Sequence, residues 1–318
     1  MTMKPNPMVI LTGPTAVGKT ALSIALAKKI NGAIISADSM QVYKYMDIGS
    51  AKIMPEEMDG VRHYLVNELD PSDEFHVVRF VEMAKQALKE ITANGQIPIV
   101  VGGTGFYIQA LLYDIDFTEN EGNVELRANL EALAAEEGPE AFHARLVRAD
   151  PKAAEEIHAN NVKRVIRALE YYEMTGERIS EHNEEQREKK SPYNFAYFVL
   201  NDERASLYGR IDRRVDEMMK DGLVKEVESL KNEGCRRGMV SMQGLGYKEI
   251  LDYLDGEIPL EEAVRVLKRD TRHFAKRQLT WFRRERDVIW VEKPEFAYDD
   301  EKILAFMLKI IKERGIMK

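Results

Sequence analysis

The chain has 318 residues, of which 44% are hydrophobic and 31% charged, and its net charge at pH 7 is −8. Its single cysteine excludes an internal disulfide and a thiolate zinc site, and its six histidines lack metal-ligand spacing. No apolar run approaches the ~20 residues that span a bilayer, and no signal-peptide pattern precedes the first motif, so we expect a cytoplasmic protein that has no membrane partner.

The first predicted elements are a short strand over residues 8–11 and an amphipathic helix that begins near residue 20. Between them lies a segment that fits G-x-x-x-x-G-K-[ST], a phosphate-binding loop (P-loop) in its usual strand-to-helix context. Backbone N–H groups and the helix N-terminus favour phosphate oxygens, Lys19 adds a point charge, and the Thr20 hydroxyl can ligate Mg²⁺. The residues expected to bind a diphosphate or triphosphate are Gly13, Pro14, Thr15, Ala16, Val17, Gly18, Lys19 and Thr20.

A second buried strand, near residues 33–36, leads directly into Asp38. In a P-loop protein such an aspartate can bind Mg²⁺ through water or take a proton from a nucleophile. The alternative is a carboxylate that only caps a turn. Ser39 and Gln41 beside it have the hydrogen-bonding groups to contact the edge of a base.

A helix is predicted over residues 75–94 and a strand over residues 97–101, which enters a glycine-rich turn containing Thr104. Apolar strands that alternate with helices predict an α/β fold, with a parallel sheet covered by helices on both faces. In such folds the loops that follow the strands meet at one edge. We therefore expect the P-loop, the Asp38 loop and the Thr104 turn to lie together.

The character of the sequence changes at residues 118–192, which are highly charged and helical, without a strand signal. We interpret this segment as an all-helical insertion domain in a P-loop core formed by residues 1–117 and 193–318. The core resumes with two predicted strands and a final helix, at residues 194–200, 288–291 and 299–314.

The acidic total hides a basic segment, residues 261–290, which has nine Lys or Arg against five Asp or Glu. Within it Lys276, Thr280 and Arg283 follow at i, i+4 and i+7, so they share one face of a helix. Residues 162–170 likewise place basic side chains opposite an apolar stripe. One such helix is usually solvated surface, but stripes of this kind also follow the phosphates of a nucleic acid.

Six blocks of the chain resemble, in the same order, those of the tRNA dimethylallyltransferase family, bacterial enzymes that prenylate the adenosine 3′ of the anticodon. The blocks are residues 13–20, 38–43, 101–107, 163–170, 244–248 and 276–283. The resemblance covers nearly the whole chain. It implies that the P-loop holds the diphosphate of dimethylallyl diphosphate, with Mg²⁺ as cofactor, and that a monomer acts on tRNA.

The resemblance also implies roles in catalysis. Lys19 would stabilise charge on the leaving diphosphate, and Asp38 would be the general base for the adenosine N6. Thr104 would lie at the reaction channel, or alternatively cap the helix that follows it. Arg210 and Arg214, one helical turn apart, could clamp the diphosphate, unless they belong to an exposed face with neighbouring aspartates.

The tRNA partner is expected to bind through its anticodon stem-loop, with the target nucleotide extruded from the stack. The helical insertion would form a second jaw. The residues assigned to tRNA contact are Asp38, Ser39, Met40, Gln41, Thr104, Arg127, Lys163, Arg164, Val165, Ile166, Arg167, Gln243, Gly244, Gly246, Tyr247, Lys248, Lys276, Arg277, Gln278, Thr280, Trp281 and Arg283.

Three other functions share part of this pattern. A small-metabolite kinase would use the same P-loop and aspartate, but it leaves the insertion and the basic helices without a role. A prenyltransferase for free adenine nucleotides needs no long basic surface. A tRNA-binding protein with a degenerate P-loop does not explain the intact Lys19, Thr20 and Asp38.

Overall fold

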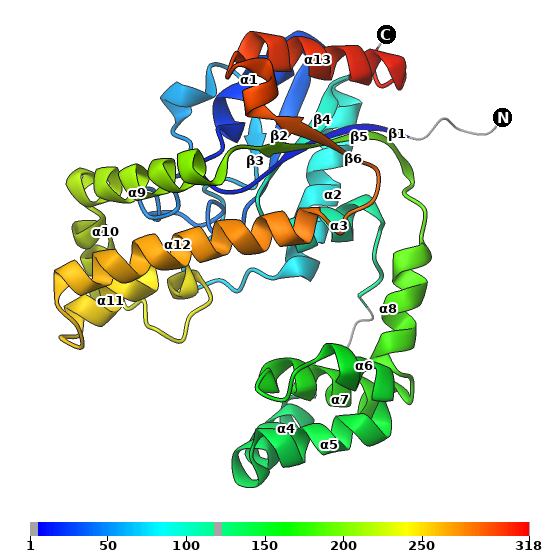
Figure 1. The fold of residues 1–318 in the computed structure, drawn as a ribbon, viewed down its shortest axis with the longest axis vertical. Helices are drawn as coiled ribbons and strands as arrows, with labels where there is room; N and C mark the ends of the chain where they lie inside the picture. Colours follow the sequence, from blue (N-terminus) through cyan, green and yellow to red (C-terminus); the bar gives the residue numbers. More distant parts are fainter. Residues whose placement is uncertain (1–5, 118–122, 318) are drawn as a thin grey trace. The chain divides into compact units, whose positions relative to one another are not determined.

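The structure is a computed structural model that describes residues 6–117 and 123–317 (Figure 1). It contains two compact units: the first consists of residues 1–112 and 192–318, and the second of residues 113–191. The start predicted for the insertion, residue 118, lies outside the described residues. None of the helices in the described ranges combines the length and the apolar character needed to cross a membrane.

The first unit is built on a six-stranded sheet whose strands are all parallel, in the order β3-β2-β4-β1-β5-β6. The strands are β1 (Asn6–Thr12), β2 (Gly32–Ala37), β3 (His63–Tyr64), β4 (Ile97–Gly102), β5 (Tyr193–Asn201) and β6 (Val288–Glu292). In β1 the side chains of Val9, Ile10 and Leu11 are all completely buried, as a sheet covered on both faces requires. The predicted α/β fold is confirmed, and β3, only two residues long, is an addition to it.

Helices cover both faces of this sheet (Figure 1). The helices of the first unit are α1 (Lys19–Ile30), α2 (Val77–Ala93), α3 (Gly105–Leu112), α9 (Arg204–Asp221), α10 (Leu223–Asn232), α11 (Tyr247–Leu254), α12 (Leu260–Phe282) and α13 (Asp300–Glu313). The helix α12 is amphipathic: its buried face carries Ala263, Leu267, Ala275, Gln278 and Phe282. These residues are separated by three, four or eight positions, which follows the helical period, so α12 has one core face and one solvent face.

The second unit consists of five helices: α4 (Val124–Glu137), α5 (Pro139–Ala149), α6 (Pro151–Glu156), α7 (Val162–Thr175) and α8 (Ile179–Glu188). Its own core includes Phe142 and Leu146 from α5 and Leu169 from α7. The buried Asp150 joins two of its helices, because its carboxylate accepts hydrogen bonds from Ala153 N (3.0 Å) and from Ser180 N (2.9 Å). The residues of this unit that the structure describes are helical, as predicted, and contain no strand.

Candidate active site at the carboxyl edge of the sheet

The P-loop follows β1 and leads into α1 through backbone conformations that favour glycine. Gly13 has φ 145° and Gly18 has φ 97°, and a Cβ on Gly13 would lie 2.5 Å from the carbonyl oxygen of Leu200. No described side chain caps the N-terminus of α1, so its first N–H groups are available to an anion. Lys19 Nζ lies over the loop and donates to Gly13 O (3.0 Å) and Pro14 O (2.9 Å).

Two cations that repel each other stand at this loop. The pKa of Lys19 is lowered to about 8, mainly by burial and in addition by the charge of Arg214, while the charge of Asp38 opposes both effects. Burial also lowers the pKa of Arg214, with Glu217 opposing and Arg210 adding to the shift. Half-buried positive charges in this arrangement favour a multiply charged anion. Binding of a diphosphate by the P-loop stays a prediction.

Arg210 has three partners within the protein. Its Nε donates to Ala16 O in the P-loop (2.8 Å), its Nη1 donates to Ser206 Oγ (3.1 Å), and its Nη2 is ion-paired with Asp202. Because its Nε donates to the loop itself, Arg210 supports the P-loop. Contact with the diphosphate stays a prediction for Arg210 and Arg214.

A further cation near the loop was missed by the sequence reading. Lys293 follows β6, and its Nζ would lie 3.3 Å from a Cβ placed on Gly18. It is also 3.2 Å from Asp300 Oδ1 at the start of α13, and its side chain is largely buried. Its position after a strand of the sheet, on the P-loop side, was the signal that could have revealed it.

Asp38 lies at the end of β2 and turns the chain. Its Oδ1 accepts hydrogen bonds from Met40 N (2.8 Å) and Gln41 N (3.3 Å), while its Oδ2 has no hydrogen bond to any described residue. Burial raises the pKa of the carboxyl group, against the two N–H groups and the charge of Lys19. Asp38 thus forms a turn with one oxygen, while the other has no hydrogen bond within the described residues, so the turn and the predicted role in proton transfer are compatible.

Thr104 adjoins this aspartate through the backbone, because its N–H donates to Ala37 O (3.2 Å). Its carbonyl accepts from Tyr107 N and Ile108 N at the start of α3. The Thr104 hydroxyl makes no hydrogen bond to any described residue, so it does not act as a side-chain cap. The P-loop, the Asp38 loop and the Thr104 turn therefore meet at one edge, as predicted from the topology.

The side chain of Gln41 is already engaged within the loop. Its Oε1 accepts from Ser36 Oγ (3.3 Å), and its Nε2 donates to Ala51 O (3.2 Å). Ser39 and Met40 are partly exposed beside it, and a Cβ on Gly244 would lie 2.5 Å from Met40 Cε. Contact between these residues and a base stays a prediction.

Most of the block at residues 244–248 is buried in the first unit instead of facing solvent. Tyr247 is completely buried, and its hydroxyl donates to Glu226 Oε1 (2.8 Å). The carboxylate of Glu226 also accepts hydrogen bonds from the loop that follows Asp38, at the N–H groups of Asp47 (2.9 Å), Ile48 (2.7 Å) and Gly49 (3.0 Å). Gly244 and Gly246 are buried too, whereas Gln243 is exposed and Lys248 partly exposed. The buried Tyr247 thus helps to fix the loop after Asp38 through Glu226, and contact with tRNA stays a prediction for Gln243 and Lys248.

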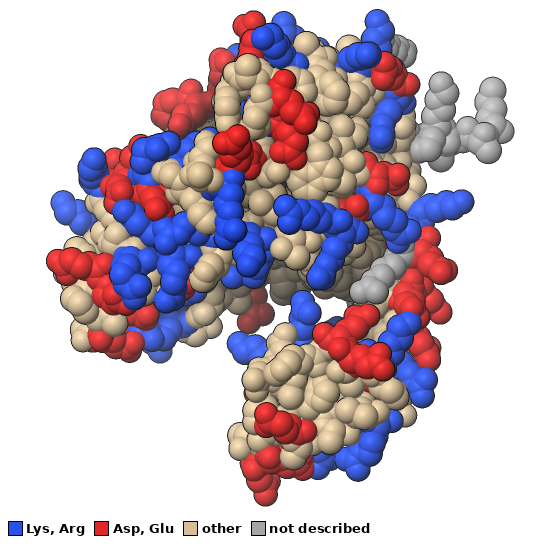
Figure 2. Space-filling view, viewed as in Figure 1, with Lys and Arg blue, Asp and Glu red and all other residues tan. Residues whose placement is uncertain are grey.

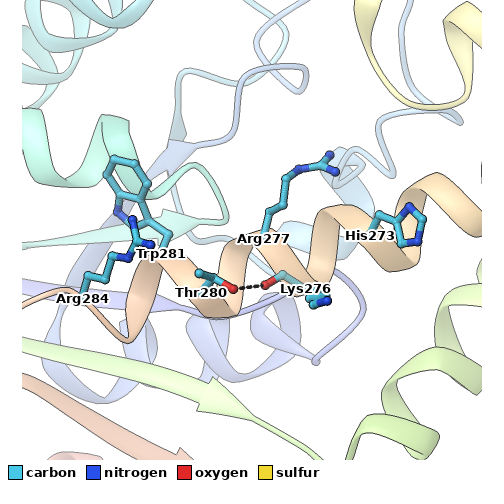
Figure 3. Close-up of a pocket in the computed structure, with 6 residues that line it drawn as sticks. All are labelled: His273, Lys276, Arg277, Thr280, Trp281 and Arg284. Atoms are coloured by element: carbon cyan, nitrogen blue, oxygen red, sulfur yellow. Dashed lines mark hydrogen bonds between the residues drawn. The ribbon is translucent and has the colours of Figure 1, made fainter. Parts of the chain in front are cut away.

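The solvent face of α12 carries the predicted basic stripe. Figure 2 shows Lys and Arg side chains gathered over the part of the first unit that α9 and α12 occupy. An open pocket on α12 is lined by His273, Lys276, Arg277, Thr280, Trp281 and Arg284 (Figure 3). Arg283 is exposed next to it. Gln278, by contrast, is only 6% exposed and points into the protein.

In the second unit, as on α12, some of the residues predicted to contact tRNA are exposed and others are buried. Lys163, Arg164 and Arg167 of α7 are exposed. Val165 and Ile166 are 0% and 4% exposed and belong to the core of the unit, so their side chains are not on the surface that a nucleic acid could touch. Arg127 of α4 is exposed as well and lies 3.6 Å from Glu131.

Comparison with known proteins places this site in a family. The family model described as IPP transferase matches residues 41–285. The tRNA dimethylallyltransferase of Lachnoclostridium phytofermentans is 63% identical over 98% of this chain and 100% of that protein, and that of Acetivibrio thermocellus is 53% identical over 93% and 95%.

Solved structures agree with these sequences. The full-length tRNA isopentenylpyrophosphate transferase from Bacillus halodurans is 44% identical, with a TM-score of 0.73 over 98% of both chains. A eukaryotic dimethylallyltransferase acting on tRNA is 32% identical, with a TM-score of 0.78 over 90% of this chain and 74% of that one. The resemblance in the six sequence blocks is confirmed, and the chain belongs to the IPP transferase family, that of the tRNA dimethylallyltransferases.

Proposed function

We propose that the chain transfers a dimethylallyl group from dimethylallyl diphosphate to N6 of the adenosine 3′ of the anticodon in tRNA, and releases diphosphate. One observation carries the chemistry: the partly buried carboxylate of Asp38 and the cations of the P-loop lie at the same edge, close enough for Asp38 and Lys19 to affect each other's pKa. A base beside a diphosphate-binding loop is what this reaction needs.

In the proposed reaction the N6–C1 bond forms as the C1–O bond to diphosphate breaks, and the electron pair of that bond leaves with the diphosphate. The N–H groups of the P-loop, Lys19 and Arg214 stabilise the charge that grows there. The available Oδ2 of Asp38 takes the proton from N6, and the Thr104 hydroxyl can donate to a diphosphate oxygen. The amine is a weak nucleophile, so alignment of the two substrates contributes much of the acceleration.

Magnesium fits this site through few protein ligands. The Thr20 hydroxyl, in the exposed first turn of α1, makes no hydrogen bond to a described side chain or carbonyl, so it can ligate the ion. The described residues contain no group of three His, Cys, Asp or Glu side chains arranged for a metal, so oxygens of the diphosphate would complete the shell. Bound there, Mg²⁺ would supply additional positive charge to the leaving group.

The first experiment incubates the protein with dimethylallyl diphosphate, Mg²⁺ and an unmodified tRNA that has adenosine at the 3′ side of its anticodon. Nucleoside mass spectrometry is expected to find a dimethylallyl group on N6, and no product when AMP replaces the tRNA. Modified AMP would indicate a prenyltransferase of free nucleotides. Turnover of ATP without prenylation would indicate a kinase.

Light scattering tests the predicted monomer.

The exposed cations of α12 are expected to contribute to tRNA affinity. Lys276→Ala and Arg283→Ala should each weaken tRNA binding and reduce the slope of log K against log salt by about 0.7–0.9, because each removes one phosphate contact. Filter binding at several salt concentrations measures both effects. Lys309→Ala, on the exposed surface of α13, is the matched control. Equal affinities in all four proteins would mean that this helix face does not bind RNA.

The pH dependence of kcat/KM for dimethylallyl diphosphate should be bell-shaped. Activity should rise with pH as Asp38 ionises, at a pH above the ordinary carboxyl range because burial raises its pKa. Activity should fall above about pH 8, where Lys19 loses its charge in the free enzyme. Lys19→Arg keeps the positive charge at high pH, so the falling limb should move to higher pH in that variant. A falling limb that does not move would assign it to another group.

A further inference from the structure

Gln278 connects two loops of the proposed active site that are far apart in the chain. Its Oε1 accepts a hydrogen bond from Thr15 N in the P-loop (2.9 Å), and its Nε2 donates to Gly103 O in the turn before Thr104 (2.9 Å). The side chain is 6% exposed. Because one loop offers a donor and the other an acceptor, a single orientation of the amide satisfies both.

The helix that carries Gln278 is fitted closely to that turn. A Cβ on Gly103 would lie 2.1 Å from Gln278 Nε2, and a Cβ on Gly105 would lie 2.2 Å from Cδ1 of Trp281, one helical turn further on. Because the two glycines have no Cβ, the side chains of α12 approach the turn closely at both positions. Through these two contacts, which are one helical turn apart on α12, the helix fixes the position of the loop at residues 103–105.

We propose that Gln278 is a positioning residue, which sets the spacing between the P-loop and the Thr104 turn. The inference rests on the proposed function, in which the P-loop holds the leaving group and the turn lies beside the attacking amine. The hydrogen bond to Gln278 also occupies the N–H of Thr15, so that group belongs to the framework of the loop and the later N–H groups serve the phosphates. This role replaces the tRNA contact predicted for Gln278 from sequence.

The test separates positioning from RNA binding. Gln278→Ala should lower kcat by about 10- to 100-fold, the loss expected when reacting groups are misplaced by about 1 Å. Its Kd for tRNA should stay within about twofold of the wild-type value, because the exposed stripe is intact. Gln278→Glu keeps an acceptor for Thr15 N but loses the donor to Gly103 O. It should likewise lower kcat without weakening tRNA binding, and its fold should be preserved. Weaker tRNA binding with unchanged kcat would overturn the proposal, as would no effect.

A second-site experiment tests the contact itself. Gly103→Ala should displace the amide of Gln278, because its Cβ would lie 2.1 Å from Gln278 Nε2, so adding Gln278→Ala should cost little further activity. Gly102→Ala is the matched control: there the Cβ would lie 2.1 Å from the backbone oxygen of Ala37, so adding Gln278→Ala should still lower kcat by about 10- to 100-fold. The same outcome on both backgrounds would contradict the proposal.

A binding readout keeps this inference distinct from the reaction. Inorganic diphosphate is used as the probe, and its affinity for Gln278→Ala is expected to be about 3- to 10-fold lower than for the wild type, as the P-loop loses one support. If the wild-type protein binds diphosphate but prenylates no tRNA, the proposed function fails while this measurement still stands. Wild-type affinity in Gln278→Ala would refute the positioning role alone.

Discussion

Asp38→Asn is expected to lower kcat by about 10²- to 10⁴-fold, the usual contribution of a general base. The amide keeps an oxygen that can accept from Met40 N and Gln41 N, so the turn should persist, but it cannot take the proton from N6. Single-turnover prenylation with saturating substrates measures the effect. The affinity for tRNA should change little, because a base acts mainly in the transition state.

The control for this variant is Asp59→Asn, which neutralises an exposed carboxylate ion-paired with Lys28 and should leave kcat unchanged. Asp38→Ala should lose as much turnover and, in addition, the hydrogen bonds of the turn. If Asp38→Asn turned over at the wild-type rate, Asp38 would have no part in proton transfer, and the raised pKa of its carboxyl group would have only a structural cause.

Lys19→Met is expected to reduce kcat/KM for dimethylallyl diphosphate by about 10²- to 10³-fold, as for the loss of one group that stabilises charge in the transition state. Inorganic diphosphate should also bind more weakly, whereas the Kd for tRNA should not change. The measurements are initial rates against dimethylallyl diphosphate concentration and calorimetric titration with diphosphate. Lys29→Met, at the exposed end of the same helix, is the control.

The same variant should be no less stable than the wild type. Burial and the neighbouring Arg214 both disfavour the charged form of Lys19, so its removal relieves an unfavourable arrangement that serves binding. An unfolding temperature equal to or above that of the wild type is expected from calorimetry. A large decrease in this temperature would mean that the bonds from Lys19 to Gly13 O and Pro14 O dominate, and that the loss of activity reports a disordered loop.

Local patterns were enough to predict the framework of the site. The P-loop and Asp38 each follow a short apolar strand, and the topology of parallel sheets then brings them together without any knowledge of their contacts. What the sequence did not reveal were roles that depend on contacts between distant segments. Tyr247 and Gln278 look like surface residues in charged helices, yet Tyr247 reaches Glu226 and Gln278 reaches Thr15.

A signal for Gln278 was nevertheless present. Gln278 lies three residues after Ala275 and four before Phe282, which are both completely buried, so it shares their face of the helix. Lys276 and Thr280 lie on the opposite face, which is exposed to solvent. Helical phase therefore separates the structural members of this block from the exposed ones. The family resemblance concerns residues 276–283 as a whole, so it does not distinguish the buried residues of this block from the exposed ones. Arg210 gives no such signal, because its distinction from Arg214 depends on the position of Asp202.

The order of strands in the sheet has a consequence for biosynthesis. The strand β1 is synthesised first, but its neighbours are β4 and β5, and the pairing with β5 joins residues such as Asn6 and Tyr193. In a nascent chain β1 can pair with β4 once residues near 102 have emerged, but its other edge stays unpaired until residues near 200 have left the ribosome. Since the helical unit has its own core and can form from local contacts, its early folding would shorten the loop that must close before β5 can pair.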